Sequence, residues 1–147
     1  MNKYMLLAVN EAKKAYIKNE IPVGAVIVRD NEVIATGTNS VEEKKCALCH
    51  AEINAIKEAS EKCGKFLDEC DMYVTLEPCA MCTGAIINSR IKRLYIGANE
   101  PKTGCCGSKF DLITKNHFNH KVEVYYGIME RECKKIIQDF FEKIRKK

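Results

Sequence analysis

The alternation of hydrophobic and polar residues divides the first third of the chain into one helix and two strands. Residues 3–18 place small and aromatic side chains three and four positions apart, which predicts an amphipathic helix that ends before Pro22. Two apolar runs at 23–28 and 32–37 flank a short polar segment, a pattern typical of a tight hairpin. The first two strands are therefore expected to be antiparallel. The stripe of the first helix consists of Tyr4, Ala8, Glu11, Ala12, Ala15 and Tyr16.

Beyond the hairpin, strand and helix patterns alternate. The strand, helix, strand order between 72 and 97 predicts a parallel crossover unit. Together with the hairpin, this order predicts an α/β protein with one mixed five-stranded sheet and helices on both faces. The other predicted elements are a helix from Ala51 to Cys63, strands at 72–76, 93–97 and 122–126, a helix from Pro78 to about Ser89, a short helix near 109–115 and a final helix from about 129.

Composition indicates a soluble globular protein. The 147 residues are 46% hydrophobic and 30% charged, and a chain of this length buries roughly 70% of the surface that its unfolded form exposes. We expect a single domain over residues 1–147. The first apolar run is interrupted by charged residues, so we expect neither an export signal nor a membrane span, and a cytoplasmic location. In that compartment the nine cysteines are expected to be thiols or metal ligands.

Two close cysteine pairs raise the question of which residues bind a metal. Cys46 and Cys49 form one C-x2-C pair, and Cys79 and Cys82 form the other. Two such pairs are a strong zinc signal, but 29 residues separate these two, against about 15 to 20 in a zinc ribbon. The intervening segment also contains a predicted helix, which disfavours a structural four-cysteine site.

A second arrangement uses His50 with Cys79 and Cys82 and leaves Glu52 free. Both cysteines lie in the first turn of a predicted helix, where the helix dipole favours thiolate over thiol. His50 and Glu52 stand at the start of the other helix, so both side chains can face one site. Three protein ligands leave a fourth position for water, whose pKa zinc lowers to about 7. Because H-x-E followed by P-C-x2-C is a signature of zinc-dependent nucleobase deaminases, we expect Zn²⁺ at these ligands and Glu52 as acid and base.

With these motifs in hand, the chain resembles the cytidine deaminase-like superfamily, whose fold has three α/β/α layers. It closely resembles the bacterial tRNA-specific adenosine deaminases within that superfamily, and the likeness extends nearly from end to end. The matching stretches are 20–28 (EIPVGAVIV), Asn39, 50–52 (HAE), 73–86 (YVTLEPCAMCTGAI), 89–91 (SRI), 101–108 (PKTG with GS), 119–120 (NH) and 139–141 (DFF).

The resemblance implies a homodimeric enzyme that converts adenosine to inosine at the wobble position of a tRNA anticodon loop. Activated water would attack carbon 6 of adenine, and Glu52 would protonate the ring nitrogen and then the departing amine. By position, Asn39 should hydrogen-bond the base and Ala51 should border it. Glu100 and Phe141 match positions that contact RNA beside the target base.

The sequence departs from the family pattern at two places. Residues 46–49 read CALC, where the family has D-P-T-A or a similar sequence. The wall that this loop forms before His50 is therefore expected to differ from that of the family. Glu100 replaces the usual aspartate and places its carboxylate one methylene further from the backbone.

The C-terminal helix separates the competing functions. From Met129 to Lys147 there are seven basic residues against four acidic ones, which form either a solvated helix face or an RNA-binding surface. In the second case, Phe141 would stack on a base and Arg145 would contact phosphate.

A deaminase of free guanine, cytosine or cytidine would share the zinc site without needing this helix. A zinc-stabilised binding module that catalyses nothing would have no use for Glu52.

Overall fold

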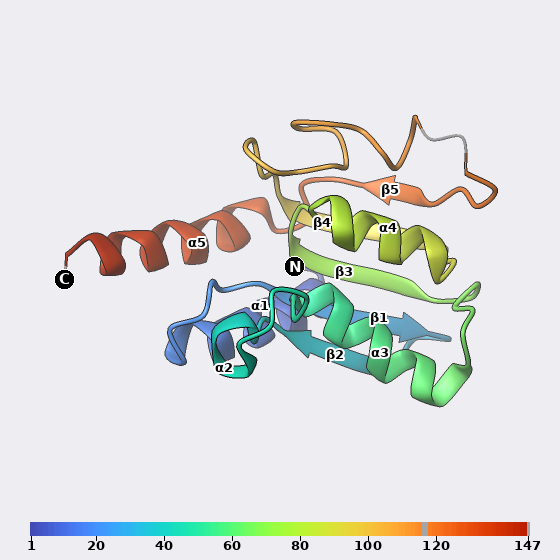
Figure 1. Ribbon diagram of the computed structural model, residues 1–147, viewed down its shortest axis with the longest axis horizontal. Coiled ribbons are helices and arrows are strands. Elements are labelled where there is room, and N and C mark those ends of the chain that lie inside the picture. The colour runs from blue at the N-terminus through green and yellow to red at the C-terminus, as the bar shows by residue number, and fades with distance from the viewer. Residues whose placement is uncertain (116–117, 147) are drawn as a thin grey trace.

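Five strands form one mixed sheet in the spatial order β2-β1-β3-β4-β5 (Figure 1). The computed structural model describes residues 1–115 and 118–146 of the chain. The strands are β1 (Gly24–Arg29), β2 (Glu32–Thr38), β3 (Asp71–Leu76), β4 (Arg93–Ala98) and β5 (Glu123–Tyr125). The helices are α1 (Lys3–Ile17), α2 (Val41–Lys44), α3 (Ala51–Cys63), α4 (Ala80–Asn88) and α5 (Glu130–Arg145).

The sheet combines antiparallel and parallel pairing, as the sequence predicts. β1 pairs antiparallel with β2 and with β3, whereas β3 with β4 and β4 with β5 are parallel. The predicted hairpin and the predicted crossover are both confirmed. Leu76 of β3 pairs with Ala98 of β4, so the segments that follow these two residues leave the same edge of the sheet side by side. Ligand sites in open α/β sheets commonly lie at this edge.

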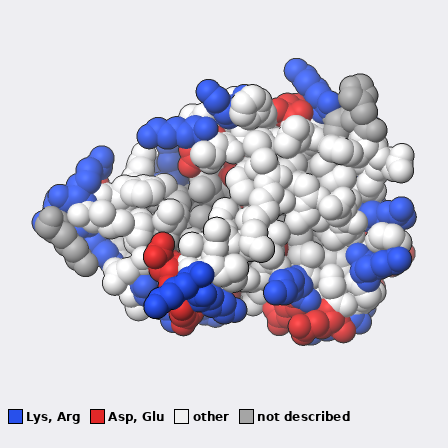
Figure 2. All heavy atoms as spheres, in the orientation of Figure 1, with Lys and Arg blue, Asp and Glu red and all other residues white. Residues whose placement is uncertain are grey.

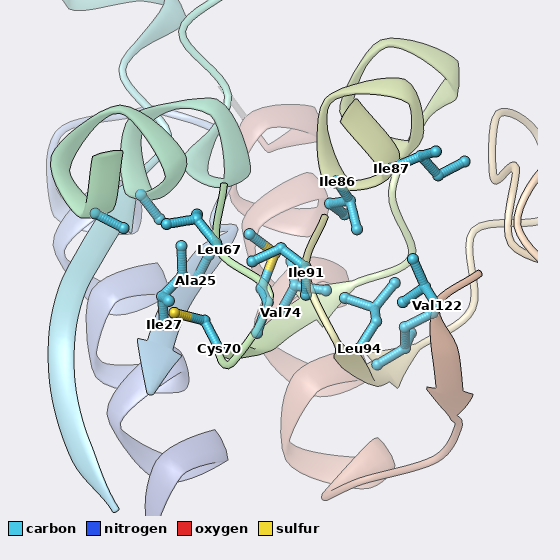
Figure 3. Packing of buried hydrophobic residues seen from close by; sticks show 14 of the residues in the cluster. Ala25, Ile27, Leu67, Cys70, Val74, Ile86, Ile87, Ile91, Leu94 and Val122 are labelled. Carbon is cyan, nitrogen blue, oxygen red and sulfur yellow. The ribbon is translucent and has the colours of Figure 1, made fainter. Parts of the chain in front are cut away.

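Helices cover both faces of the sheet. α3 and α4 pack on one face, and α1 with the first half of α5 packs on the other (Figure 1). The side chains of β1 alternate between these layers, because Ala25 and Ile27 join the α3–α4 cluster whereas Val26 and Val28 join the α1–α5 cluster. Figure 3 shows the first cluster, in which strand side chains meet Ile86 of α4.

α5 is attached to the sheet by its first half and then extends past the sheet edge (Figure 1). Cys133 is buried against β4 at Gly97, where an added Cβ atom would lie 2.3 Å from the Cys133 sulfur, so only glycine allows this approach. Further along, Phe140 is 2% exposed and meets the ring of Tyr16 edge to face, with centroids 5.8 Å apart. These contacts fix the direction in which α5 leaves the sheet.

The prediction of a short helix at 109–115 is wrong, because this stretch forms turns. The N–H of Leu112 donates to the carbonyl of Cys105 at 2.9 Å instead of to a helical partner four residues back. The Asp111 carboxylate also accepts the N–H of Thr114 at 2.9 Å, so this stretch closes into local turns.

Other elements differ from the prediction in their bounds or were not predicted. α4 begins at Ala80 with Cys79 as its N-cap, so Pro78 lies outside the helix that it was expected to open. β5 covers only Glu123–Tyr125, and the four-residue helix α2 had no prediction. Among the described residues, no helix combines the length and hydrophobicity needed to cross a bilayer.

Candidate active site and metal centre

Two helix N-termini bring three metal-ligating side chains together. His50 is the N-cap of α3, Cys79 is the N-cap of α4, and Cys82 lies in the first turn of α4. The His50 Nδ1 atom lies 3.7 Å from the Cys79 sulfur and 3.5 Å from the Cys82 sulfur. All three ligand atoms lie within 4.8 Å of one another, and the described part of the chain contains no other such group of three or more His, Cys, Asp or Glu side chains. The structure thus contains a metal-binding group made of the residues in the motif.

The hydrogen bonds and charges around the two thiols favour a bound cation. A hydrogen bond from Cys82, followed by one from His50, lowers the pKa of Cys79 to about 4, so this sulfur is a thiolate at neutral pH. The same bond to Cys79 raises the pKa of Cys82, which retains the shared proton when no metal is bound. The pKa of His50 is raised by its hydrogen bond to Cys79. A metal ion would take the place of the protons that Cys82 and His50 donate to Cys79.

Glu52 lies beside this group in the first turn of α3. Its side chain is 3% exposed, and burial raises its pKa to about 7. The helix start places Glu52 and His50 on the same pocket, although the two residues are only two positions apart. A buried carboxyl in this position can both accept and donate a proton near neutral pH.

Cys46 and Cys49 form a thiol pair apart from the metal group. The N–H of Cys49 donates to the carbonyl of Cys46 at 3.2 Å, which closes a turn that places the two thiols near each other. The pKa of Cys46 is lowered first by a hydrogen bond from the Leu48 backbone and then by the Cys49 thiol. Neither sulfur joins the three-ligand group among the described residues.

A pocket of about 620 Å³ joins the metal group to the inner side of α5. Four of the five predicted substrate-binding residues line this pocket, namely Asn39, Ala51, Glu100 and Phe141. The fifth, Arg145, is exposed at the end of α5 and does not line it. Lys and Arg side chains gather where α5 ends (Figure 2), whereas Lys147 of the predicted basic tail lies outside the described residues.

Asn39 is already engaged by the backbone around the pocket. Its Nδ2 donates to the Ile21 carbonyl at 3.0 Å, and its Oδ1 accepts from the N–H of Val41 at 3.3 Å. Because an amide side chain has two N–H groups and two lone pairs on oxygen, one donor and one lone pair remain for a base. Asn39 therefore ties together the backbone segments at Ile21 and Val41 and also lines the pocket.

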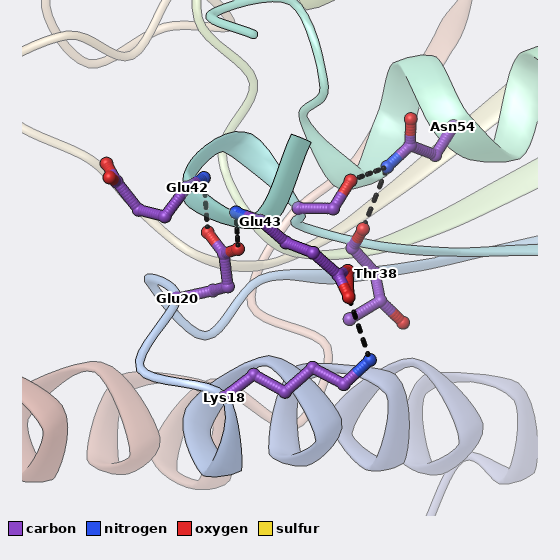
Figure 4. Close-up of polar contacts among 7 residues, drawn as sticks. Lys18, Glu20, Thr38, Glu42, Glu43 and Asn54 are labelled. Carbon is purple, nitrogen blue, oxygen red and sulfur yellow. Dashed lines mark hydrogen bonds and ion pairs between the residues drawn. The ribbon is translucent and has the colours of Figure 1, made fainter. Parts of the chain in front are cut away.

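Sequence reasoning missed Glu20, which builds another part of the pocket wall. Its side chain is 2% exposed and accepts the N–H groups of Glu42 at 2.9 Å and Glu43 at 2.7 Å, at the start of α2 (Figure 4). Asn54 ties the adjacent segment by donating to the carbonyl of Thr38 at 2.8 Å (Figure 4). The short helix α2 thus depends on an acceptor more than twenty residues away in sequence, which no local pattern indicates.

Glu77 was also missed, although it belongs to the EPCAMC segment. It lines the pocket, is 3% exposed and accepts hydrogen bonds from the loop at 100–108. The only sequence signal was its position two residues before Cys79.

A His-Cys-Cys group with a buried glutamate at the strand ends of this mixed sheet defines a deaminase of the cytidine deaminase-like class. The model of the MafB19-like deaminase family matches residues 1–145. The tRNA-specific adenosine deaminase of Bacillus subtilis (strain 168) is 43% identical over 145 residues, which cover 98% of this chain and 90% of that protein. The tRNA-specific adenosine deaminase of Rickettsia typhi is 44% identical over 141 residues, which cover 94% and 95%. The chain belongs to the MafB19-like deaminase family, in its branch of tRNA-specific adenosine deaminases.

Solved structures agree with this assignment. A structure from work on A-to-I editing by tRNA:A34 deaminases at the wobble position superposes with a TM-score of 0.87 at 42% identity, covering 90% of this chain and 97% of that one. The guanine deaminase of Bacillus subtilis superposes with a TM-score of 0.63 at 38% identity, covering 67% and 66%. The predicted three-layer cytidine deaminase-like fold is confirmed.

Proposed function

We propose that this protein hydrolyses adenosine to inosine, with release of ammonia, at the wobble position of a tRNA anticodon loop. The observation that carries the proposal is a continuous pocket that joins the metal group and Glu52 to α5. The names and full-length similarity of the tRNA-specific adenosine deaminases support adenosine in tRNA as the substrate.

Zinc is the metal that we assign to His50, Cys79 and Cys82. With Zn–S bonds of about 2.3 Å and Zn–N bonds of about 2.0–2.1 Å, tetrahedral angles place nitrogen and sulfur about 3.5 Å apart. The nitrogen–sulfur distances of 3.5 and 3.7 Å fit this geometry. When bound by three protein ligands, zinc supplies a polarised water with a pKa of about 7.

Glu52 is the proton carrier in this proposal. Its carboxylate takes a proton from the attacking water and delivers it to N1 of adenine as the water oxygen adds to C6. It then takes the proton of the new C6 hydroxyl and passes it to the exocyclic nitrogen, so that ammonia leaves and the C6 carbonyl forms. Its 3% exposure keeps bulk water from competing for these protons.

The pocket wall provides the contacts for the base and its neighbours. Asn39 offers its remaining amide donor and lone pair to the base, and the small side chain of Ala51 leaves room for the ring. Glu100 and Phe141, the latter from α5, line the pocket, where Glu100 accepts from a ribose hydroxyl and Phe141 stacks on a neighbouring base. Arg145, outside the pocket, contacts phosphate as part of the basic end of α5.

The anticodon stem-loop is the part of the tRNA that reaches this pocket, and we propose that the enzyme acts in the cytoplasm as a homodimer. Both statements follow the family resemblance.

A second candidate function is deamination of a free base such as guanine. The 38% identity with a guanine deaminase favours this second function. The metal site does not distinguish the two candidates, because both kinds of deaminase would use it. That match covers only 67% of this chain, whereas the tRNA:A34 deaminase match covers 90%.

Ammonia release, which the deamination of each of these substrates produces, tests the choice directly. The purified protein is incubated with an anticodon stem-loop that has adenosine at the wobble position and, separately, with free adenosine, cytidine and guanine. The proposal predicts a far larger kcat/KM for the stem-loop than for any free compound. A preference for a free base would select the second candidate, and no turnover of any substrate by the zinc-loaded protein would favour a binding module.

A further inference from the structure

The segment after β3 connects the metal group to a neighbouring loop that lines the same pocket. Glu77 follows the last residue of β3, and its backbone N–H donates to the carbonyl of Ala98 at the end of β4, at 2.9 Å. Two residues later comes the metal-ligating Cys79. The neighbouring loop, residues 100–108, carries Glu100 and Thr103, which both line the pocket.

The carboxylate of Glu77 accepts four hydrogen bonds, all from this loop. Its Oε1 atom accepts the N–H of Glu100 at 3.0 Å and the hydroxyl of Ser108. Its Oε2 atom accepts the N–H groups of Cys106 and Ser108, both at 3.0 Å. Charge-assisted bonds of this kind are stronger than bonds between neutral groups, and burial protects them from water.

The loop is shaped to close around this carboxylate. At Gly104 an added Cβ atom would lie 2.5 Å from the Glu77 Oε2 atom and 2.5 Å from the carbonyl oxygen of Glu100, so any side chain would push the loop off the carboxylate. The carbonyl of Pro78 adds a backbone attachment by accepting the N–H of Cys105 at 2.9 Å. Two consecutive residues just before Cys79 therefore hold the loop.

We propose that Glu77 is a positioning residue that sets where the 100–108 loop, with Glu100 and Thr103, stands relative to the metal group. Both of its oxygens are occupied by loop donors, so it takes no part in proton transfer. Its effect falls on the affinity for RNA, and in this respect the proposal rests on the proposed function.

Glu77→Gln tests this role because an amide cannot replace the carboxylate here. One of the two oxygens becomes an NH₂ group, which faces N–H donors instead of accepting from them. Gly104→Ala should also displace the loop from Glu77, because the added methyl group collides with the carboxylate. Glu69→Gln is the matched control, because Glu69 is exposed and lies before the opposite end of β3.

Two measurements report the position of the loop. Limited trypsin digestion reads cleavage after the exposed Lys102, and it needs no substrate. We expect cleavage in Glu77→Gln and in Gly104→Ala to be about tenfold faster than in the control, because the loop loses its buried acceptor. Steady-state kinetics with the stem-loop should show KM raised about tenfold with kcat within about threefold, and metal analysis should show the wild-type zinc content.

The outcomes separate this role from a general structural one. A partly unfolded enzyme loses kcat in proportion to its inactive fraction and keeps its KM, so that result would overturn the proposal. Unchanged cleavage at Lys102, or loss of zinc in Glu77→Gln, would overturn it too. If the wild-type protein does not deaminate the stem-loop, the proposed function fails, and the digestion still decides whether Glu77 holds the loop.

Discussion

Phe140 and Phe141 are neighbours in α5 with different surroundings, and truncating each one measures a different role of this helix. Phe140 is 2% exposed and packs edge to face on Tyr16. Replacing a fully buried phenylalanine by alanine removes its transfer free energy and leaves a cavity, at a typical cost of about 3–5 kcal/mol. Phe140→Ala should therefore lower the free energy of unfolding by about this amount.

Phe141 is 41% exposed, so about three fifths of its surface is buried in the folded protein. Full burial of such a side chain is worth roughly 1.5–3 kcal/mol, and no closed cavity forms at a half-open site. Phe141→Ala should then cost only about 1–2 kcal/mol of stability. Stacking of a base on an aromatic ring contributes about 1–3 kcal/mol, so the same change should weaken stem-loop binding roughly 5- to 150-fold.

The assay combines urea unfolding with stem-loop titration of both variants under conditions where each is folded. We expect Phe140→Ala to show the larger loss of stability and Phe141→Ala the larger loss of affinity for the stem-loop. A wild-type Kd for Phe141→Ala would refute stacking at this position. A loss below about 1 kcal/mol for Phe140→Ala would refute the packing role assigned to it.

The remaining predictions concern the metal and the end of α5. Cys46→Ala and Cys49→Ala should keep about one zinc per chain by metal analysis, whereas Cys79→Ala should lose it; loss in either of the first two would revive the four-cysteine site. Chelation should abolish inosine formation, and added Zn²⁺ should restore it. Deleting residues 141–147 should weaken stem-loop binding and its salt dependence while zinc stays bound. Arg145→Ala alone should reduce the slope of log Kd against log salt concentration by about 1. An unchanged slope would show that Arg145 is a solvated side chain at the helix end and does not contact phosphate.

Local sequence patterns predicted the sheet because each strand is a short apolar run between turn residues. The buried face of α3 was harder to predict. Its isoleucines are partly exposed, whereas Ala51, Ala55 and Ala59 are fully buried. Only small side chains fit there, because α3 lies so close to β2 that a Cβ atom at Gly37 would be 1.9 Å from the Ala51 carbonyl oxygen. That proximity is a tertiary fact which hydrophobic spacing does not contain.

Local sequence patterns likewise predicted some residues of the site and not others. The metal group was predictable because His50, Cys79 and Cys82 occupy helix starts within recognisable motifs. Glu20 and Glu77 were not, because each is a lone glutamate whose partners lie 22 or more residues away along the chain. Arg145 has a strong local charge signal, and the structure places it outside the pocket.

Replacing Glu52 by glutamine is the sharpest test of proton transfer by this residue, because the change keeps the shape of the side chain and removes its ability to carry protons. Inosine formation in the stem-loop is measured at saturating substrate, together with zinc content and stem-loop affinity. Proton transfer by Glu52 predicts unchanged zinc content and stem-loop affinity with kcat reduced about a hundred- to ten-thousand-fold, the usual contribution of general acid–base catalysis. A variant that keeps most of its kcat while binding zinc and RNA normally would contradict it.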